Sequence, residues 1–248
     1  MIAGASEGLG AAYARALGRR GMDLVLVARR SEPLEALAAR LRDELAIEVR
    51  TISLDLAEPD AIEQLFRSTA TLEVGVAIYN AAFAPVGELV TMATEQLVRV
   101  VDVNVRAPLL FARAFAPPMV ARRRGAIVLV SSVAGLQGSP RIACYAASKA
   151  FEIVLAEGLW GELRRRGVDV LGVTAGAIRT PGYRGASRRE APGTLDPAIV
   201  AERSLDAIGG GPISVPGWIN RLASWILGRL LPRRLAIAVM AASTSELR

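Results

Sequence analysis

Short, continuous apolar runs alternate along the chain with longer segments that are apolar on one side and polar on the other. The short runs are typical of strands buried on both faces of a parallel sheet, and the longer segments have the period of amphipathic helices. This alternation predicts an α/β fold with a doubly wound, Rossmann-type parallel sheet. We expect strands at Leu24–Ala28, Val49–Leu54, Val74–Tyr79, Ala126–Val130, Val168–Val173 and Ile213–Val215, and helices near 9–20, 33–46, 59–70, 94–120, 142–166 and 197–208.

The chain has the length of one such unit. Doubly wound domains commonly reach 248 residues, and neither a linker nor a repeat is visible. We expect one domain over residues 1–216 and a helical extension over residues 217–248. The first strand is a difficulty, because a glycine-rich turn begins at Gly4 and leaves only Met1–Ala3 for a strand that should lie in the middle of the sheet. Either this strand is unusually short, or the true N-terminus lies upstream of Met1.

The net charge of +6 does not indicate nucleic-acid binding. The tight arginine clusters, 122–124 and 164–166, stand just before Gly125 and Gly167, at the expected ends of helices. Cations complement the helix dipole there, and we expect Gly125, Gly167 and likewise Gly21 to close helices in the left-handed conformation. The clusters are therefore explained as helix ends.

The composition excludes several kinds of chemistry. The chain has no histidine and only one cysteine, Cys144, which excludes disulfides, histidine-ligated metals and a serine–histidine relay, and we expect no metal site. Cys144 itself is expected to be a small buried or pocket-lining residue. Of thirty lysines and arginines only Lys149 is lysine, which indicates that this position needs an ammonium group.

No segment is predicted to cross a membrane. The longest clean apolar stretch near the end, Leu235–Ala242, is far shorter than the roughly 18 residues that a spanning helix needs. No signal peptide is evident at the start. We expect a cytoplasmic protein, or one bound peripherally to a membrane.

The turn Gly4-Ala5-Ser6-Glu7-Gly8-Leu9-Gly10 has glycines where a backbone must approach a pyrophosphate at a helix N-terminus. A glycine-rich turn between two elements is common, and the spacing here differs from the G-x-G-x-x-G fingerprint. It resembles instead the T-G-x-x-x-G-x-G turn of the short-chain dehydrogenase/reductase family, with Ala3 in place of the threonine.

Tyr145 and Lys149 are one helical turn apart and therefore share a face. A free phenol has a pKa of about 10, so it is a poor base unless a nearby cation favours its phenolate. Lys149 can supply that cation, and Ser132, at the end of an expected strand, can polarise the oxygen that receives the proton. A tyrosine–lysine pair is usually a surface pair and such a serine is usually a turn or cap, but the lone lysine at this spacing favours catalysis.

These residues resemble the active site of the same family. Ser132, Tyr145 and Lys149 match its catalytic serine and Y-x-x-x-K pair, and Asn104 in Asp-Val-Asn-Val matches the asparagine that supports its proton relay. An asparagine inside a helix also often bonds nearby backbone. The resemblance covers essentially residues 1–216 and implies that this domain binds a nicotinamide cofactor and is catalytic.

Further segments resemble the family's cofactor contacts. Asp55 matches the adenine-contacting aspartate, although it could also be an ordinary helix cap. Asn80-Ala81-Ala82 resembles N-A-G with alanine for glycine, and residues 175–180 resemble P-G-x-x-x-T with alanine for proline. The implied cofactor-binding set is Gly4, Ser6, Gly8, Leu9, Gly10, Arg29, Arg30, Asp55, Leu56, Asn80, Ala81, Tyr145, Lys149, Ile178 and Thr180.

The end of the second expected strand indicates the choice of cofactor. NAD-preferring sites place an acidic residue there, whereas this chain has Ala28-Arg29-Arg30-Ser31. Arginine favours a 2′-phosphate through bidentate, charge-assisted bonds, so we expect NADP(H) rather than NAD(H). A surface salt bridge is the alternative. Glu7 weakens the prediction, because many NADP-dependent relatives have a basic residue at that position.

The remaining segments concern the substrate. Residues 181–195 resemble the family's substrate loop, and 7–14 resemble the branch containing 17β-hydroxysteroid and 3-ketoacyl reductases, which implies a small lipophilic carbonyl or alcohol substrate. Residues 218–231 have helical spacing, and a second apolar segment follows 232–234. This extension could be a membrane-surface helix, a lid over an apolar substrate, a dimer contact, or packing on its own domain. We also expect a homo-oligomer.

The resemblance implies an NADP(H)-dependent oxidoreductase that interconverts a ketone and a secondary alcohol by hydride transfer, with a proton relay through Ser132, Tyr145 and Lys149 assisted by Asn104. Two alternatives stay open. One is a non-catalytic protein that senses NADP(H), which Ala82 and Ala175 permit. The other is an epimerase or dehydratase on the same fold, which would retain its cofactor through turnover.

Overall fold

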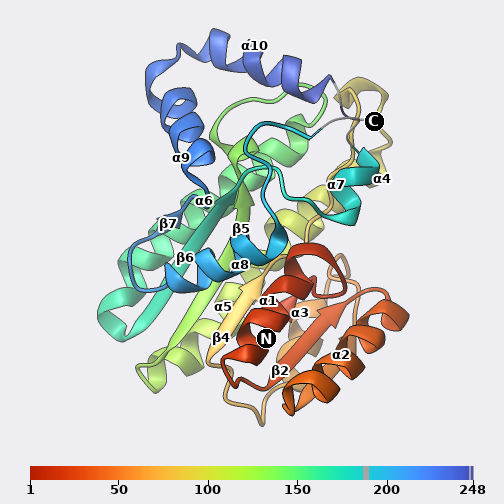
Figure 1. Cartoon of the computed structure of the whole chain (residues 1–248), viewed down its shortest axis with the longest axis vertical. Coiled ribbons are helices and arrows are strands. Elements are labelled where there is room, and N and C mark those ends of the chain that lie inside the picture. Colours follow the sequence, from red (N-terminus) through yellow and green to blue (C-terminus); the bar gives the residue numbers. More distant parts are fainter. Residues whose placement is uncertain (187–189, 246, 248) are drawn as a thin grey trace.

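A seven-stranded parallel sheet forms the centre of the molecule (Figure 1). The structure, a computed structural model, describes residues 1–186, 190–245 and 247. The strand order β3-β2-β1-β4-β5-β6-β7 confirms the predicted doubly wound α/β class. The strands are β1 (Ile2–Ala3), β2 (Leu24–Ala28), β3 (Val49–Ser53), β4 (Val76–Tyr79), β5 (Gly125–Ser132), β6 (Val168–Ala175) and β7 (Ile213–Ser214).

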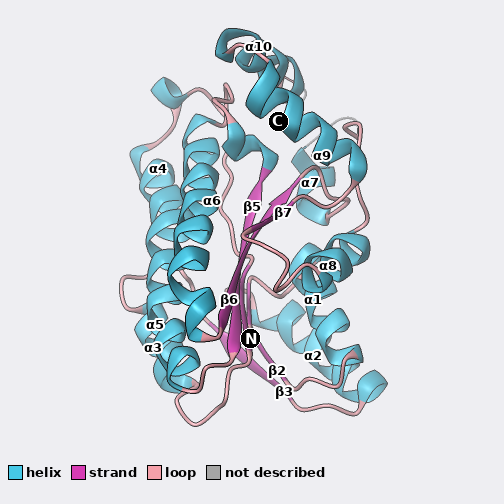
Figure 2. Ribbon diagram, turned by 90° about the vertical axis from the view of Figure 1, so that its left-hand side faces the viewer, coloured by secondary structure: helices cyan, strands magenta, loops and turns pink. Residues whose placement is uncertain are grey.

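Helices cover both faces of the sheet, as Figure 2 shows. A separate cluster of buried apolar side chains fills the space under each layer, so the sheet has a core on both sides. One layer holds α1 (Gly8–Arg19), α2 (Ser31–Leu45) and α8 (Pro197–Asp206), and the other holds α3 (Ala61–Ser68), α4 (Thr94–Val101), α5 (Ala107–Ala121) and α6 (Ala143–Leu163).

The first strand is short but fully paired. Ile2 and Ala3 are completely buried and pair with β2 on one side and β4 on the other. The amine of Met1 donates a hydrogen bond to the carbonyl oxygen of Val76 at 2.8 Å, and burial lowers the pKa of this amine to about 5. Ile2 and Ala3 therefore pair with only two residues of each neighbouring strand, Leu26 and Val27 of β2 and Ile78 and Tyr79 of β4.

The predicted helix near 94–120 is present, but it contains a π-turn that the sequence did not reveal. The chain forms α4, then a π-helix at Asp102–Arg106, then α5. A π-turn holds one residue more per hydrogen-bonded ring than an α-turn, and it shifts the side chains that follow around the axis. The apolar period of the sequence does not reveal this insertion, which places Asn104 inside the π-helix.

Two of the three glycine predictions are confirmed. Gly21 and Gly167 have φ values of +75° and +80°, in the left-handed region. Gly125 was wrong, because it opens β5 with φ +157° and the left-handed position falls on Arg123 at φ +54°. A Cβ atom at Gly125 would lie 2.5 Å from Cγ of Met119, so close packing rather than a helix cap requires this glycine.

The C-terminal residues form a helical arm beyond the carboxyl end of β5 (Figure 1). We call residues 217–245 and 247 the C-terminal arm; it contains α9 (Trp218–Trp225), a π-helix (Ile226–Leu230) and α10 (Arg233–Thr244). No helix in the described ranges is both long and apolar enough to span a membrane.

Candidate active site

The glycine turn packs directly on the end of β4. Gly4 has φ +83°, and a Cβ atom there would lie 2.6 Å from the backbone nitrogen of Ala81. A Cβ atom at Gly10 would lie 2.0 Å from the carbonyl oxygen of Gly4. Asn80 fixes the turn by donating from Nδ2 to that same oxygen at 2.8 Å. Glycine is therefore required at both positions by contact with neighbouring backbone.

The same turn meets the end of β6. Gly8 has φ +58°, and a Cβ atom there would lie 2.9 Å from Cγ2 of Thr180. Gly8 also begins α1, whose N-cap residue Glu7 makes no side-chain capping bond. The first N–H groups of a helix lack partners within the helix and lie at the positive end of its dipole. The geometry fits the pyrophosphate of a dinucleotide at the switch point between β1 and β4.

The two arginines after β2 have different surroundings. Arg30 forms an ion pair with Glu7, with 2.8 Å between Nη2 and Oε2, which matches the salt-bridge alternative for this residue. Arg29 is exposed, and within the described part of the chain it forms no ion pair. Arg29 is therefore the arginine that remains free for an anionic ligand.

Asp55 and Leu56 follow β3 at the same edge of the sheet. Asp55 accepts two hydrogen bonds from Nη2 of Arg99, at 2.9 and 2.6 Å, and one from the backbone nitrogen of Ala57 at 3.0 Å. Burial alone would raise the pKa of Asp55, but Arg99, the Ala57 amide and Arg29 together hold it below its usual range. Asp55 is thus a charged acceptor fixed in place, and Leu56 beside it is buried.

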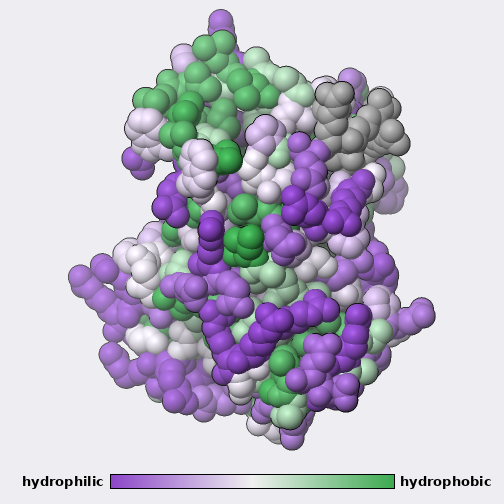
Figure 3. All heavy atoms as spheres, in the orientation of Figure 1, coloured by the Kyte–Doolittle hydropathy of each residue, from purple (hydrophilic) through white to green (hydrophobic). Residues whose placement is uncertain are grey.

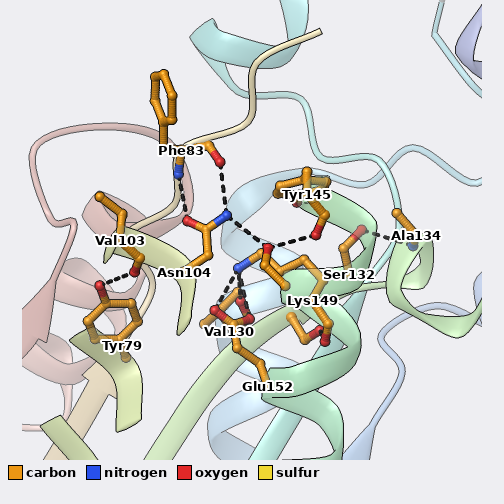
Figure 4. A network of polar contacts seen from close by, with 12 residues as sticks. Tyr79, Phe83, Val103, Asn104, Val130, Ser132, Ala134, Tyr145, Lys149 and Glu152 are labelled. Carbon is orange, nitrogen blue, oxygen red and sulfur yellow. Dashed lines mark hydrogen bonds and ion pairs between the residues drawn. The ribbon is translucent and has the colours of Figure 1, made fainter. Parts of the chain in front are cut away.

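Figure 4 shows the predicted catalytic side chains at the carboxyl end of β5. Ser132 ends β5, and its Oγ accepts a hydrogen bond from the backbone nitrogen of Ala134 at 3.1 Å. Tyr145 and Lys149 lie on α6, with 5.8 Å between Nζ and the centre of the tyrosine ring. Ser131 joins β5 to α6 by donating from Oγ to the carbonyl oxygen of Lys149 at 2.6 Å. The predicted face shared by tyrosine and lysine is present.

The ammonium of Lys149 has a partner that sequence reasoning missed. Nζ donates to both carboxylate oxygens of Glu152, at 3.0 and 2.8 Å, and to the carbonyl oxygen of Val130 at 2.8 Å (Figure 4). The two side chains are only 3% and 0% exposed. Burial raises the pKa of Glu152 to about 7, and Lys149 opposes this rise. The available signal was an acidic residue three positions after the lysine, inside an apolar segment of the helix.

Asn104 is completely buried and its side chain is fully engaged. Its Oδ1 accepts from the backbone nitrogen of Phe83 at 2.8 Å, and its Nδ2 donates to the carbonyl oxygen of Phe83 at 2.9 Å and to Oγ of Ser148 at 3.0 Å. The side chain therefore ties the segment after β4 to α6. It contacts Ser148, the neighbour of Lys149, and not Lys149 itself.

A small cleft lies beside Tyr145. Cys144 lines it, as predicted, and the other lining residues are Pro85, Gly87, Leu89, Met92, Leu97, Arg141, Ile142 and Ala143. Most of these side chains are apolar, so the cleft suits an apolar group beside Tyr145.

The C-terminal arm is bound across the segment between Ser132 and Tyr145. Nη1 of Arg141 donates to the carbonyl oxygens of Thr244, Ser245 and Leu247 at 3.1, 3.3 and 2.8 Å, and Arg233 donates to the carbonyl oxygen of Leu136 at 3.0 Å. Such bonds from a guanidinium are among the stronger ones in proteins. The arm therefore lies against the segment that joins Ser132 to Tyr145.

The start of the arm is joined to the segment that resembles a substrate loop. Asn220 donates from Nδ2 to the carbonyl oxygens of Gly193 and Pro216, at 3.1 Å each. The loop itself is closed where Ile178 pairs with Leu195. Residues 187–189 of this loop lie outside the described residues.

The chain is similar in sequence to known oxidoreductases over most of its length. Residues 1–191 match the model of the short chain dehydrogenase family. The chain is 35% identical over 181 residues to a 7beta-hydroxysteroid dehydrogenase of Clostridium sardiniense, a match that spans 73% of this chain and 69% of the relative. It is 32% identical over 239 residues to a very-long-chain 3-oxoacyl-CoA reductase of Podospora anserina, spanning 92% and 69%.

Two solved structures are similar in sequence and shape. One, from work on the stereoselectivity of 7beta-hydroxysteroid dehydrogenase, has a TM-score of 0.90 at 27% identity and covers 96% of this chain and 95% of that chain. The other, a short-chain dehydrogenase from Sphingobium yanoikuyae in complex with NADPH, has a TM-score of 0.78 at 34% identity and covers 87% and 86%. The first match extends through nearly the whole chain and therefore into the arm.

Proposed function

The chain belongs to the short chain dehydrogenase family of oxidoreductases, which act on CH–OH and C=O groups, and we propose that it uses NADP(H) to interconvert a lipophilic ketone and its secondary alcohol. The observation that carries the proposal is the placement of Tyr145 over Lys149, beside Ser132, at the sheet edge that also holds the glycine turn. Carbonyl reduction requires a proton donor close to a dinucleotide-binding site, and both lie here at the carboxyl ends of the strands.

The chain's own residues handle the proton and the oxygen. When bound, NADP(H) supplies or accepts the hydride. Tyr145 donates its hydroxyl proton to the carbonyl oxygen during reduction, and Lys149 stabilises the phenolate that remains. Ser132 accepts a bond from Ala134, which leaves its own O–H free to donate to the same carbonyl oxygen.

Asn104 supports the relay by position. The π-helix around it packs against α6, and π-turns interrupt the regular ladder of backbone bonds. We propose that a backbone carbonyl of this π-helix holds a water molecule, and that a proton returns from this water through Lys149 to Tyr145. This role rests on the backbone, since the side chain is engaged by Phe83 and Ser148.

A panel of ketones and secondary alcohols, followed through the absorbance of NADPH, tests the proposed function. Oxidation of NADPH that requires a ketone supports it. Binding of NADPH without any change in absorbance would favour the sensing protein, and product formation without net oxidation of the cofactor would favour an epimerase or dehydratase.

We infer that the cofactor is NADP(H), because Arg29 is the free arginine after β2 and a similar structure is an NADPH complex. The protein should bind NADPH more tightly than NADH, and Arg29→Asp should narrow or reverse this preference. The loss of charge-assisted bonds to a 2′-phosphate should weaken NADPH binding by roughly ten- to a hundredfold. Arg40→Asp, an exposed site on α2, is the matched control. Equal affinity of the unmodified protein for both cofactors would refute this role of Arg29.

The substrate is proposed to be lipophilic. The names of two groups of relatives refer to hydroxysteroids and to very-long-chain 3-oxoacyl-CoA, whose steroid and acyl parts are bulky and apolar. The cleft beside Tyr145 is mainly apolar, and Figure 3 shows apolar side chains gathered over α9 and α10. Trp218, Leu222 and Trp225 are at least half exposed on α9. These features favour the arm as a cover for an apolar substrate.

The same surface supports the other expectations about location and assembly. Arginines border the exposed tryptophans of the arm, which suits peripheral contact with an anionic membrane. We therefore propose a cytoplasmic protein that binds peripherally to a membrane. A groove between α5 and α6 has exposed Leu109 and Val154 nearby, which suits a homo-oligomer. Light scattering and sedimentation with anionic vesicles test these two proposals.

Deleting residues 218–248 should leave NADPH affinity nearly unchanged and raise KM for lipophilic ketones, because the arm lies against the segment that joins Ser132 to Tyr145. Arg141→Gln should do the same without shortening the chain, since it removes the donor to three arm carbonyls. We expect a rise in KM of roughly tenfold. Arg221→Gln, exposed on α9, is the control. Unchanged kinetics in both arm variants would make the arm dispensable for catalysis, and a truncation that cannot fold would favour packing on its own domain.

A further inference from the structure

We propose that Glu152 is a positioning residue that holds the ammonium of Lys149 and, by the charge of its carboxylate, favours the protonated form of the Tyr145–Lys149 pair, the form that donates in carbonyl reduction. This inference rests on the proposed function of the site and adds to it a residue that sets the preferred direction of the reaction.

The geometry joins Glu152 to the catalytic pair. An ammonium group has three N–H donors, and those of Lys149 are directed to Val130 and to the two oxygens of Glu152, all within 3.0 Å. Lys149 also lies beneath the ring of Tyr145. Figure 4 shows the carboxylate and the tyrosine on different sides of the same ammonium. A change of charge at Glu152 therefore acts on both members of the pair.

The sign of the effect follows from electrostatics. A negative charge near a group favours its protonated form, and groups this close lose protons as a coupled set rather than one by one. Without Glu152 the pair would carry a net positive charge and would release its first proton more readily. Burial raises the pKa of Glu152 to about 7, so its charge is partly present at neutral pH and grows as the pH rises. With Glu152 ionised, the pair and its partner are together neutral, and the loss of a further proton would leave a buried negative charge.

Other charged groups near the site do not replace Glu152. Tyr79, on β4, is the other titratable group that interacts with the carboxylate; burial raises its pKa well above the usual value and Glu152 adds to this rise, so it stays neutral. Asp55 is balanced by its bonds with Arg99. In the π-helix that packs on α6, the charged side chains of Asp102 and Arg106 pair with each other.

The fold alone does not require this ion pair. The helix α6 is already joined to β5 through Ser131, and a buried ion pair as a whole can often be replaced by apolar side chains at little cost in stability. Lys149 is proposed to be needed for the chemistry, and the removal of Glu152 alone would leave its buried ammonium without a carboxylate. The buried acid at this position therefore serves the charge of Lys149.

The titration of the pair itself provides a test that needs no turnover. Lys149 is the only lysine of the chain, so protein labelled with ¹³C at lysine Cε gives one NMR signal for it. Labelling of tyrosine Cζ reports Tyr145, which the loss of one signal in Tyr145→Phe identifies. In Glu152→Gln the pair should lose its first proton at a pH lower by about one unit than in the unmodified protein, with or without NADP⁺.

Kinetics supply the second readout. The deprotonated pair accepts a proton during alcohol oxidation, so the pH profile of kcat/KM for oxidation should shift down by about one unit in Glu152→Gln, giving about a tenfold higher rate on its acid limb. Glu152→Asp should restore the original profile in part. Glu157→Gln, at an exposed position on the same helix, removes an equal charge and should shift neither readout.

The outcomes separate this inference from the proposed function. If no alcohol or ketone reacts but the NMR titration shifts as stated, the proposed function fails and the charge effect of Glu152 stands. If turnover is found and the pair loses its first proton at the same or a higher pH in Glu152→Gln, the inference is overturned. Glu152→Leu serves where the glutamine variant does not fold. Should neither fold, loss of a proton from the unmodified pair below neutral pH would overturn the inference, and retention would support it.

Discussion

Tyr145→Phe should lower kcat/KM for ketone reduction by roughly 10²–10⁴-fold, because the variant keeps the ring and loses only the hydroxyl proton that the carbonyl oxygen must receive. The affinity for NADPH should remain within about threefold, which is close to 0.7 kcal/mol. The ring lies over the ammonium of Lys149 in either case. Stopped-flow reduction of an active ketone and fluorescence titration of NADPH measure the two quantities separately.

Tyr13→Phe is the matched control for this substitution. Tyr13 is completely buried on α1 and belongs to the core on that face of the sheet. The substitution should leave kcat/KM unchanged. Retention of more than about a tenth of the activity by Tyr145→Phe would show that another group donates the proton, since general acid catalysis typically contributes at least 10²-fold.

The sequence predicts the sheet well because its strands are buried on both faces. β2 and the inner part of β5 are apolar at consecutive positions, a pattern that an exposed strand would not have. The helix near 94–120 was also predicted, but the π-turn inside it was not. The π-helix at Asp102–Arg106 changes the hydrogen-bond pattern without changing the apolar composition, so no local signal marks it.

The candidate site was predicted where motifs are local and missed where contacts are distant. Tyr145 and Lys149 are four residues apart, and helix geometry alone brings them to one face. The bonds from Arg141 to the arm join residues at least 103 positions apart, and only the folded chain shows them. Glu152 lies between these cases, because its spacing from Lys149 was visible but its burial was not.

The lone lysine should be as indispensable as the tyrosine. Lys149→Met keeps most of the length of the lysine side chain and removes its charge. This variant should lower kcat/KM by about 10²-fold or more, because the phenolate of Tyr145 loses the cation that stabilises it. Lys149→Arg should also be severely impaired, since a planar fork does not replace a compact ammonium in a position that is 3% exposed. If either variant has the same kcat/KM as the unmodified protein, Lys149 has no role in catalysis.

A double substitution separates that catalytic effect from a loss of stability. Lys149→Met alone leaves Glu152 completely buried without its cation, and the breaking of such a pair costs about 3–5 kcal/mol of the free energy of unfolding. Lys149→Met combined with Glu152→Leu removes both charges, so stability should recover in large part while turnover stays at least about 10²-fold low. Urea unfolding and NADPH oxidation measured on the same samples distinguish the two quantities. Recovery of turnover together with stability would mean that Lys149 serves the fold and not the proton transfer.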